Sequence, residues 1–151
     1  MRSLSKRYVA GFIDGEGCIG FGRTRKTIFP RVLVVNTNRQ ILEQLQRQFA
    51  GDIYPIAHRK SGWKSSWSWR ISWTQAVNFL DDLWPFLRIK RDQALVVFAW
   101  DENRPRKFGN VRDPQAEQFL VDQMHWLNKR GPNNDPSPLQ LELQEIEQCR
   151  A

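Results

Sequence analysis

Hydrophobic and polar residues alternate along residues 67–73, where the chain reads WSWRISW. Successive side chains of a strand point to opposite faces, so a period of two predicts a strand with one buried face. Less regular runs of strand-like residues occupy residues 18–25, 29–35 and 53–59. We therefore expect four strands, and we place the tryptophans of the strongest one against helices.

Between and after these strands the hydrophobic positions recur every three or four residues, which predicts helices. Such patterns cover residues 39–49, residues 74–84, a segment that starts near position 90, and residues 115–127. A further helix precedes the first strand. The resulting order, αββαββα followed by additional helices, predicts an α+β fold. Its four antiparallel strands would carry helices on one face and leave the other face bare.

The chain has 151 residues, which suffices for one domain with a hydrophobic core. We assign residues 1–130 to that domain. Residues 131–138 contain four prolines or glycines, a composition typical of a linker. Residues 139–151 then predict a C-terminal helix that packs on the same domain.

The net charge of +7 is unevenly distributed. Residues 1–112 contain 20 lysines and arginines against 9 acids, a net charge of +11, whereas residues 113–151 contain 3 against 7, a net charge of −4. A strongly basic surface favours a polyanionic partner. We therefore expect a nucleic acid to bind the first three quarters of the chain.

The cysteines and the hydropathy restrict the compartment. Cys18 and Cys149 match no zinc-binding spacing and predict free thiols. Free thiols indicate an intracellular, reducing compartment, either the cytoplasm or an organelle matrix. No apolar run is long enough to cross a membrane, so we expect no membrane partner.

The segment VAGFIDGEG at residues 9–17 begins like a helix and ends in two acids flanked by glycines. In a helix, Tyr8, Gly11 and Gly15 share one side. A glycine inside a helix costs about 0.5–1 kcal/mol relative to alanine. Two glycines one turn apart indicate that another helix passes very close, because small residues let two backbones approach.

The two acids of this segment, Asp14 and Glu16, fall in the last turn of the helix. The negative end of the helix dipole disfavours carboxylates there. A divalent cation would resolve this conflict, since Mg²⁺ binds carboxylates, backbone carbonyls and water. The alternative is a pair of solvated acids at a helix end.

Together, residues 9–17 resemble the LAGLIDADG motif of the homing endonucleases. The resemblance implies a homodimer, because the chain carries one motif, and it implies a four-stranded saddle that binds double-stranded DNA. Two motif helices would pack side by side through Tyr8, Gly11, Asp14 and Gly15. The implied activity is that of an intron-encoded endonuclease that cuts both strands of a long pseudo-palindromic site and leaves short 3′ overhangs. An RNA-binding intron maturase and a non-cleaving DNA-binding regulator on the same fold remain alternatives.

The resemblance also implies the parts of the active site. Glu16 would be the metal ligand, with the carbonyl of Gly15 beside it, and Mg²⁺ would be the metal. Mn²⁺ would substitute, and Ca²⁺ would support binding without cleavage. Lys90 ends the segment PFLRIK, which is similar to the P-x-L-x-x-K segment of the family, and would stabilise charge on the phosphate. Asn36 would hold metal-bound water, or it is a turn residue that caps a helix.

Outward positions of the sheet are the candidates for reading DNA bases, because arginine pairs bidentately with guanine. Lys60 is better placed for phosphates, and Arg39 either contacts the scissile region or belongs to a solvated helix face. The candidates for base contacts are Thr24, Lys26, Arg31, Arg59, Ser68 and Arg70.

Overall fold

The computed structural model describes residues 2–57, 60–104 and 113–129. The elements follow one another in the predicted order, which confirms the α+β class. The predicted linker at 131–138, the predicted helix at 139–151 and Arg59 lie outside the described residues. The elements are α1 (Lys6–Glu16), β1 (Gly17–Arg23), β2 (Ile28–Asn36), α2 (Arg39–Phe49), β3 (Asp52–Ile56), β4 (Ser66–Ser72), α3 (Trp73–Leu83), η1 (Trp84–Phe86), α4 (Arg91–Asn103) and α5 (Pro114–Leu127).

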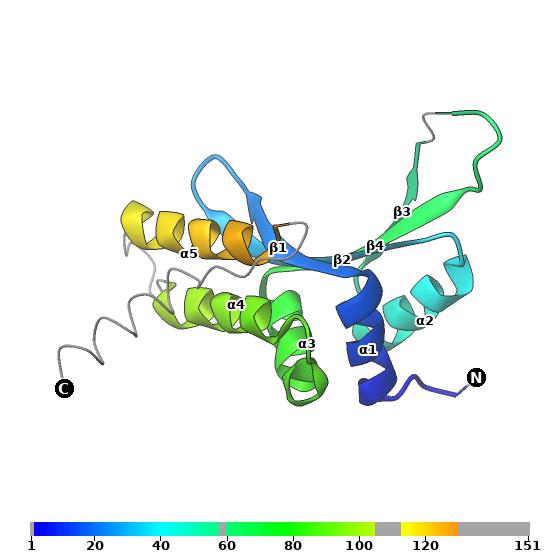
Figure 1. Cartoon of the computed structure of the whole chain (residues 1–151), viewed down its shortest axis with the longest axis horizontal. Coiled ribbons are helices and arrows are strands. Elements are labelled where there is room, and N and C mark those ends of the chain that lie inside the picture. The colour runs from blue at the N-terminus through cyan, green and yellow to red at the C-terminus, as the bar shows by residue number, and fades with distance from the viewer. Residues whose placement is uncertain (1, 58–59, 105–112, 130–151) are drawn as a thin grey trace.

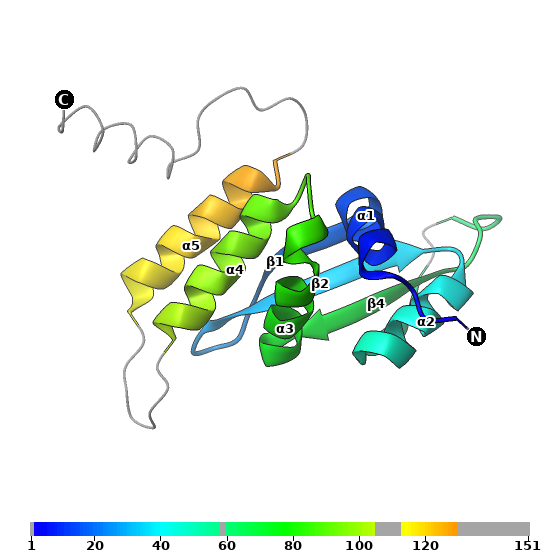
Figure 2. The same cartoon turned by 90° about the horizontal axis from the view of Figure 1, so that it is seen from below.

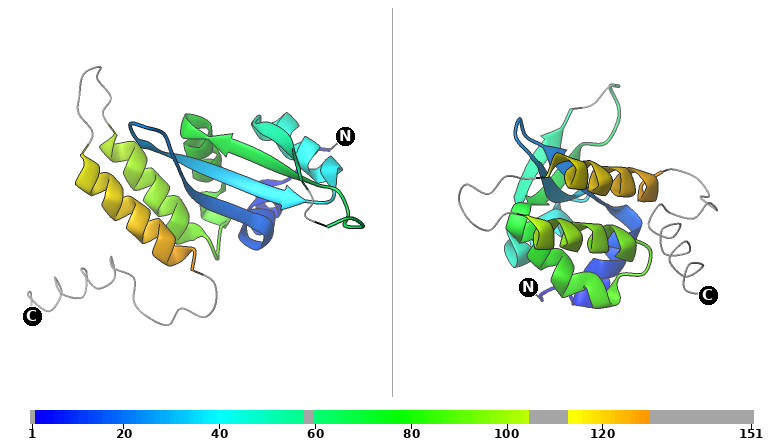
Figure 3. Two further views of the ribbon diagram at one scale, coloured as in Figure 1. Left: turned by 90° about the horizontal axis from the view of Figure 1, so that it is seen from above. Right: turned by 90° about the vertical axis from the view of Figure 1, so that its left-hand side faces the viewer.

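The four strands form one antiparallel sheet in the order β1-β2-β4-β3. Helices α1, α2, α3 and α4 lie on one face of this sheet (Figure 2). The other face is open above β2 and β4, and α5 lies to one side of it (Figure 3). The β1–β2 and β3–β4 hairpins rise at opposite ends, so the open face is a concave saddle (Figure 1).

The alternation in β4 has the predicted sense. Trp69 and Ile71 are buried on the helical side, and the ring of Trp69 packs 5.4 Å from that of Phe79. The indole Nε1 of Trp69 donates a hydrogen bond of 2.9 Å to the carbonyl of Ala50. The polar atom of this buried ring therefore has a partner, which a buried tryptophan requires.

One tryptophan of the alternating segment departs from the strand. Trp73 is the first residue of α3, with φ = 57°, and its ring stacks on that of Phe29 at 4.8 Å. The strand therefore ends at Ser72. Aromatic stacking across the end of the sheet accompanies a backbone conformation that is uncommon for a bulky side chain.

Helix starts follow the expected capping chemistry. Asn38 precedes α2 and its side-chain oxygen accepts hydrogen bonds from the amides of Gln40 and Ile41. Ser5 accepts from the amide of Tyr8 in the same way before α1. Each cap satisfies amides that have no partner within their own helix.

Candidate active site at the end of the motif helix

Glu16 is the last residue of α1, and β1 begins directly after it at Gly17. A Cβ atom on Gly17 would lie 2.8 Å from the carbonyl oxygen of Ile13, so only glycine fits this turn. The chain thus passes from helix to strand without a loop. The Glu16 side chain is exposed and has no hydrogen bond or ion pair with any residue that the structure describes. It is free to bind a ligand.

Asp14 lies one half-turn earlier and has the opposite environment. It is 9% exposed, and its carboxylate accepts hydrogen bonds from three consecutive amides. These are Arg88 N at 2.8 Å, Ile89 N at 3.1 Å and Lys90 N at 2.9 Å. Backbone donors from a distant loop therefore resolve the electrostatic conflict that suggested a cation at this carboxylate.

Lys90 reaches the same helix end. Its Nζ donates a hydrogen bond of 2.5 Å to the carbonyl oxygen of Asp14, and its side chain is half-buried. Lys90 is also the N-cap residue of α4, where the helix dipole disfavours a cation. The carbonyl at the end of α1 compensates for that. The fold thus brings Glu16 and Lys90 together at the C-terminal end of the motif helix.

Asn36 ends β2 beside this site. Gly17 is paired with Val34, so Asn36 lies two residues beyond that pair, next to the end of α1. Its side-chain oxygen accepts a hydrogen bond of 2.8 Å from the amide of Asn38. Asn36 therefore makes the turn that was one of its two predicted roles. Its role with metal-bound water stays a prediction.

The open face of the sheet carries the two predicted arginines. Arg31 lies opposite Gly20 on β1, and Arg70 lies opposite Leu33 on β2. The guanidinium of Arg70 sits 5.4 Å above the ring of Tyr54. A guanidinium stacked in this way keeps its planar donors oriented outward. Ser68 shares this face but is only 6% exposed, so its neighbours cover it.

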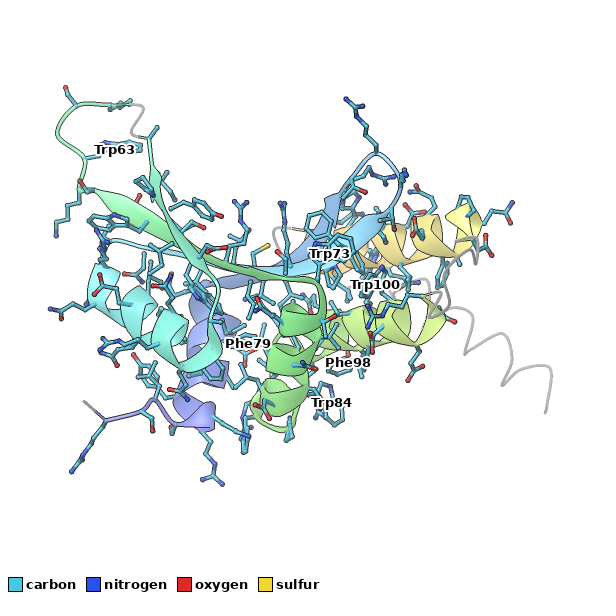
Figure 4. All side chains as sticks on the ribbon, turned by 180° about the vertical axis from the view of Figure 1, so that it is seen from behind. Trp63, Trp73, Phe79, Trp84, Phe98 and Trp100 are labelled. Carbon is cyan, nitrogen blue, oxygen red and sulfur yellow. The ribbon has the colours of Figure 1, made fainter. Side chains whose placement is uncertain are left out.

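The hairpin loops extend the basic surface beyond the sheet. Thr24 and Lys26 are exposed in the β1–β2 turn, where the hydroxyl of Thr24 accepts from the Lys26 amide. Lys60 and Trp63 lie in the β3–β4 loop, with Lys60 Nζ 6.0 Å above the indole ring. Figure 4 shows Trp63 in this loop, apart from the other five aromatic side chains that it labels.

Arg39 is engaged within its own chain. It forms an ion pair of 2.9 Å with Glu43, one turn along α2, and its guanidinium lies 5.7 Å above the ring of Trp67. Trp67 is paired with Asn36 in the sheet, whereas Glu43 lies on α2. A contact of Arg39 with a ligand would have to displace or share these partners.

Sequence reasoning missed the link between α5 and the sheet. The side-chain amide of Asn128, directly after α5, donates a hydrogen bond of 2.8 Å to the carbonyl of Ile19 in the edge strand β1. A cavity between α5 and the open face is lined by Cys18, Arg31 and His125, among others. A hydrogen bond to a backbone carbonyl leaves no residue pattern in either segment, so periodicity could not reveal it.

A single chain supplies few metal ligands. Within the described ranges, no group of three or more histidines, cysteines or acids gathers at one point. Cys18 is an exposed free thiol, and Cys149 lies outside those ranges. Nor does any helix in this part of the chain combine the length and hydropathy needed to span a bilayer. Of the two acids at the end of α1, Glu16 is the one whose carboxylate is exposed and without a partner among the described residues.

Comparison of the structure with solved structures decides the fold. The homing endonuclease I-CvuI, in complex with its target, superposes with a TM-score of 0.65 over 95% of this chain and 92% of its own, at 21% identity. The archaeal intron-encoded homing endonuclease I-Vdi141I, complexed with DNA, gives a TM-score of 0.60 over 95% and 96%, at 15% identity. The chain has the LAGLIDADG homing endonuclease fold.

The same fold occurs at twice this length. The LAGLIDADG homing endonuclease I-SmaMI, bound to cleaved DNA, superposes with a TM-score of 0.61 over 97% of this chain but only 49% of its own, at 21% identity. No family model and no curated protein sequence matches the chain. The superposed structures, which share the LAGLIDADG fold, confirm the resemblance of residues 9–17, which lie in α1 and at the first residue of β1.

Proposed function

We propose that the protein is a site-specific, metal-dependent endonuclease that acts as a homodimer on double-stranded DNA. The observation that carries this proposal is the contact of Lys90 Nζ with the last turn of the helix that ends in the unbonded carboxylate of Glu16, beside a basic concave sheet. The LAGLIDADG fold supports it, because I-CvuI and I-SmaMI with this fold are homing endonucleases bound to DNA.

The surface of α1 supports a second copy of the chain as the partner. Tyr8 is 52% exposed and stacks on Phe12 with ring centroids 6.3 Å apart. A Cβ atom on Gly11 or Gly15 would meet no atom of the described residues within 4 Å. Nothing in this part of the chain therefore requires glycine at these positions. A helix of a second copy that packs against them accounts for both, and Asp14 lies next to that face.

The open face suits the major groove of DNA, which admits a two-stranded β-ribbon. Residues 17–72 contain 10 lysines and arginines and only 2 acids. Arg31 and Arg70 project from the sheet itself and are the candidates for pairing with guanine. Thr24 and Lys26 in one hairpin, and Lys60 in the other, would contact the ends of the site, and Arg59, outside the described residues, stays a candidate from the sequence. Ser68 would need a small shift of its neighbours to reach a base.

The chemistry would take place where the two α1 helices end. The two Glu16 carboxylates, with the carbonyls of Gly15, would hold Mg²⁺, and the bound ion would supply an activated water and positive charge for the leaving oxygen of the phosphodiester. Lys90 would place its positive charge at the phosphate, and Asn36 would orient water from the end of β2. Both strands would then be cut near the two-fold axis, leaving short 3′ overhangs, as the motif resemblance implies. Mn²⁺ would substitute for Mg²⁺, whereas Ca²⁺ would support binding alone.

The test begins with the DNA site. A library of duplexes with randomised palindromic cores is selected for binding to the wild-type protein in Ca²⁺, and the selected duplex is then incubated with Mg²⁺ or Mn²⁺. We expect double-strand cleavage by the wild type. Glu16→Gln should bind the duplex in Ca²⁺ and fail to cut it in Mg²⁺. Glu102→Gln, the same change at an exposed position of α4, is the matched control and should cut normally.

If the wild type binds its selected duplex and never cuts it with either metal, the endonuclease proposal is wrong and a DNA-binding regulator takes its place. Selection of single-stranded or structured RNA over duplex DNA would instead favour an intron maturase. No feature of the described residues favours that second function, so we do not propose it.

A further inference from the structure

We propose that Asp14 is the positioning residue that fixes Lys90 in the active site, an inference that rests on the proposed endonuclease activity. Asp14 holds Lys90 at two points. Its carboxylate accepts the Lys90 amide at 2.9 Å, and its own carbonyl accepts Lys90 Nζ at 2.5 Å. The backbone amide of Lys90 and the ammonium group at the end of its flexible side chain are therefore both bound by one residue of α1, two positions before Glu16.

The loop that carries Lys90 has little else to hold it. Leu87 is anchored in the core at 1% exposure, but Ile89 is 73% exposed. Lys90 is the N-cap residue of α4, and its own side chain makes no capping hydrogen bond. The amides of Arg88, Ile89 and Lys90 all donate to the Asp14 carboxylate. These three hydrogen bonds fix the course of the backbone from the core to the first turn of α4.

A fixed backbone is needed because lysine has a four-carbon stem and a single point charge at its end. A displacement of a catalytic group by about 1 Å can cost about 100-fold in rate. Asparagine at position 14 would preserve the shape of the side chain but offer one oxygen in place of two. Its NH₂ group would then face the amide of Arg88, so the loop would shift and carry Lys90 with it.

The first experiment measures the clamp directly. Amide hydrogen exchange, read by mass spectrometry, should be slow at residues 88–90 in the wild type and much faster there in Asp14→Asn. Asp81→Asn, at an exposed position of α3, is the control and should exchange like the wild type. Unchanged exchange at residues 88–90 in Asp14→Asn would overturn the proposed clamp.

The second experiment is a double-mutant cycle on the single-turnover cleavage rate with saturating DNA. Asp14→Asn should slow the wild type by about 10- to 100-fold. In a Lys90→Met background the same change should slow the reaction by less than about 2-fold, because the group that Asp14 positions is gone. Adding Asp14→Asn should leave DNA affinity in Ca²⁺ unchanged in both the wild-type and the Lys90→Met background. Losses that multiply in the double variant would show that Asp14 acts through general stability and would overturn the positioning role.

A second pair of variants covers the case in which Asp14→Asn does not fold. Arg88→Pro removes the amide that makes the shortest bond to Asp14, and the preceding Leu87 already has the extended backbone (φ = −68°, ψ = 141°) that a proline requires. Arg88→Ala removes the same side chain and keeps the amide. We expect Arg88→Pro to cut more slowly than Arg88→Ala, and equal rates would contradict the proposal. A wild type that cuts nothing would overturn the endonuclease proposal itself, whereas a wild type that cuts with these variants unaffected would overturn only the role of Asp14.

Discussion

Asp14 and Glu16 are two positions apart in α1, yet their environments differ completely. Asp14 is 9% exposed and accepts three backbone amides, whereas Glu16 is exposed and has no partner among the described residues. The difference follows from the turn of the helix between them, which points Asp14 at the loop before α4 and leaves Glu16 exposed. The two acids of the motif therefore have separate tasks, one structural and one open to a ligand.

Parts of this site are predictable from the sequence because they carry residue-type signals. The acids of residues 9–17 and the segment that ends in Lys90 are such signals, and the structure brings them to one helix end. The contact between the Asp14 carboxylate and the amides of residues 88–90 carries no such signal. Every residue except proline has an amide, so no pattern in that loop marks it as a partner of Asp14.

At this scale the cap of α2 makes a stability prediction. Asn38→Ala removes the oxygen that accepts from Gln40 N and Ile41 N and should lower the free energy of unfolding by about 1 kcal/mol, measured by urea denaturation. Asn78→Ala, at an exposed position inside α3, is the control and should cause no loss. Equal losses in both variants would mean that Asn38 is not the cap that α2 depends on.

At the scale of the element, hydrophobic periodicity predicts well where one face of a helix or strand is buried. Helix α2 begins and ends where its pattern predicts, because Leu42 and Leu45 are fully buried and Asn38 caps it. Hydrophobic periodicity predicts less well where contacts with neighbouring elements decide where a strand ends or which residues are covered. Strand β3 stops at Ile56, and Trp73 leaves β4 to begin α3, where its ring stacks on Phe29. Ser68 faces the open side, as its alternation predicts, but surrounding side chains cover it.

A substitution in helix α1 should have opposite effects on the stability of the isolated chain and on the affinity of the proposed dimer. Gly11→Ala should raise the stability of the isolated chain by about 1 kcal/mol, because alanine favours a helix and its Cβ meets none of the described residues within 4 Å. The same change should weaken the proposed dimer, and Gly11→Leu should weaken it further. Urea denaturation of dilute protein measures the first effect, and sedimentation equilibrium measures the second.

Gly20→Ala is the control for the dimer, because a Cβ at Gly20 is equally free of contacts but lies on β1, on the open face. It should leave the dimer dissociation constant unchanged. A dissociation constant that does not increase from Gly11 to alanine to leucine would mean that α1 does not meet a second α1.

The link between α5 and β1 makes a further prediction for an element. Asn128→Ala removes the donor to the Ile19 carbonyl and should lower the free energy of unfolding by about 1 kcal/mol. Strand β1 is an edge strand, so amide exchange at residues 18–20 should also become faster. Gln118→Ala, which loses only an exposed bond to Asp122 on the same helix, is the control and should change neither measurement. Faster exchange in both variants would assign the effect to α5 as a whole.

At the scale of the whole molecule, the basic residues and the concave shape coincide on the open face of the sheet. The helices occupy one face of the sheet, and the two hairpins rise at the ends of the other (Figure 1). Arg31 and Arg70 lie on that open face, and Lys26 and Lys60 lie in the hairpins. Of the acids on the strands, only Asp52 is there, opposite Arg70. The sequence predicts this surface from composition, but the curvature that makes it a saddle emerges only from the sheet.

This arrangement predicts which lysines set the salt dependence of DNA binding. Each phosphate contact adds about one unit to the slope of log affinity against log salt. Lys60→Ala with Lys64→Ala removes two exposed charges from each β3–β4 loop, four from the proposed dimer, and should lower that slope by about four, with similar losses on all sequences. Arg2→Ala with Lys6→Ala removes the same charge from the N-terminal segment and α1, where Lys6 pairs with Asp82 on the helical side, and should leave the slope unchanged.

Because both double variants change the net charge equally, a similar loss in each would assign DNA binding to overall charge rather than to the saddle. A slope that falls only in the hairpin variant, measured by fluorescence anisotropy in Ca²⁺, would place the phosphate backbone along the rim of the open face.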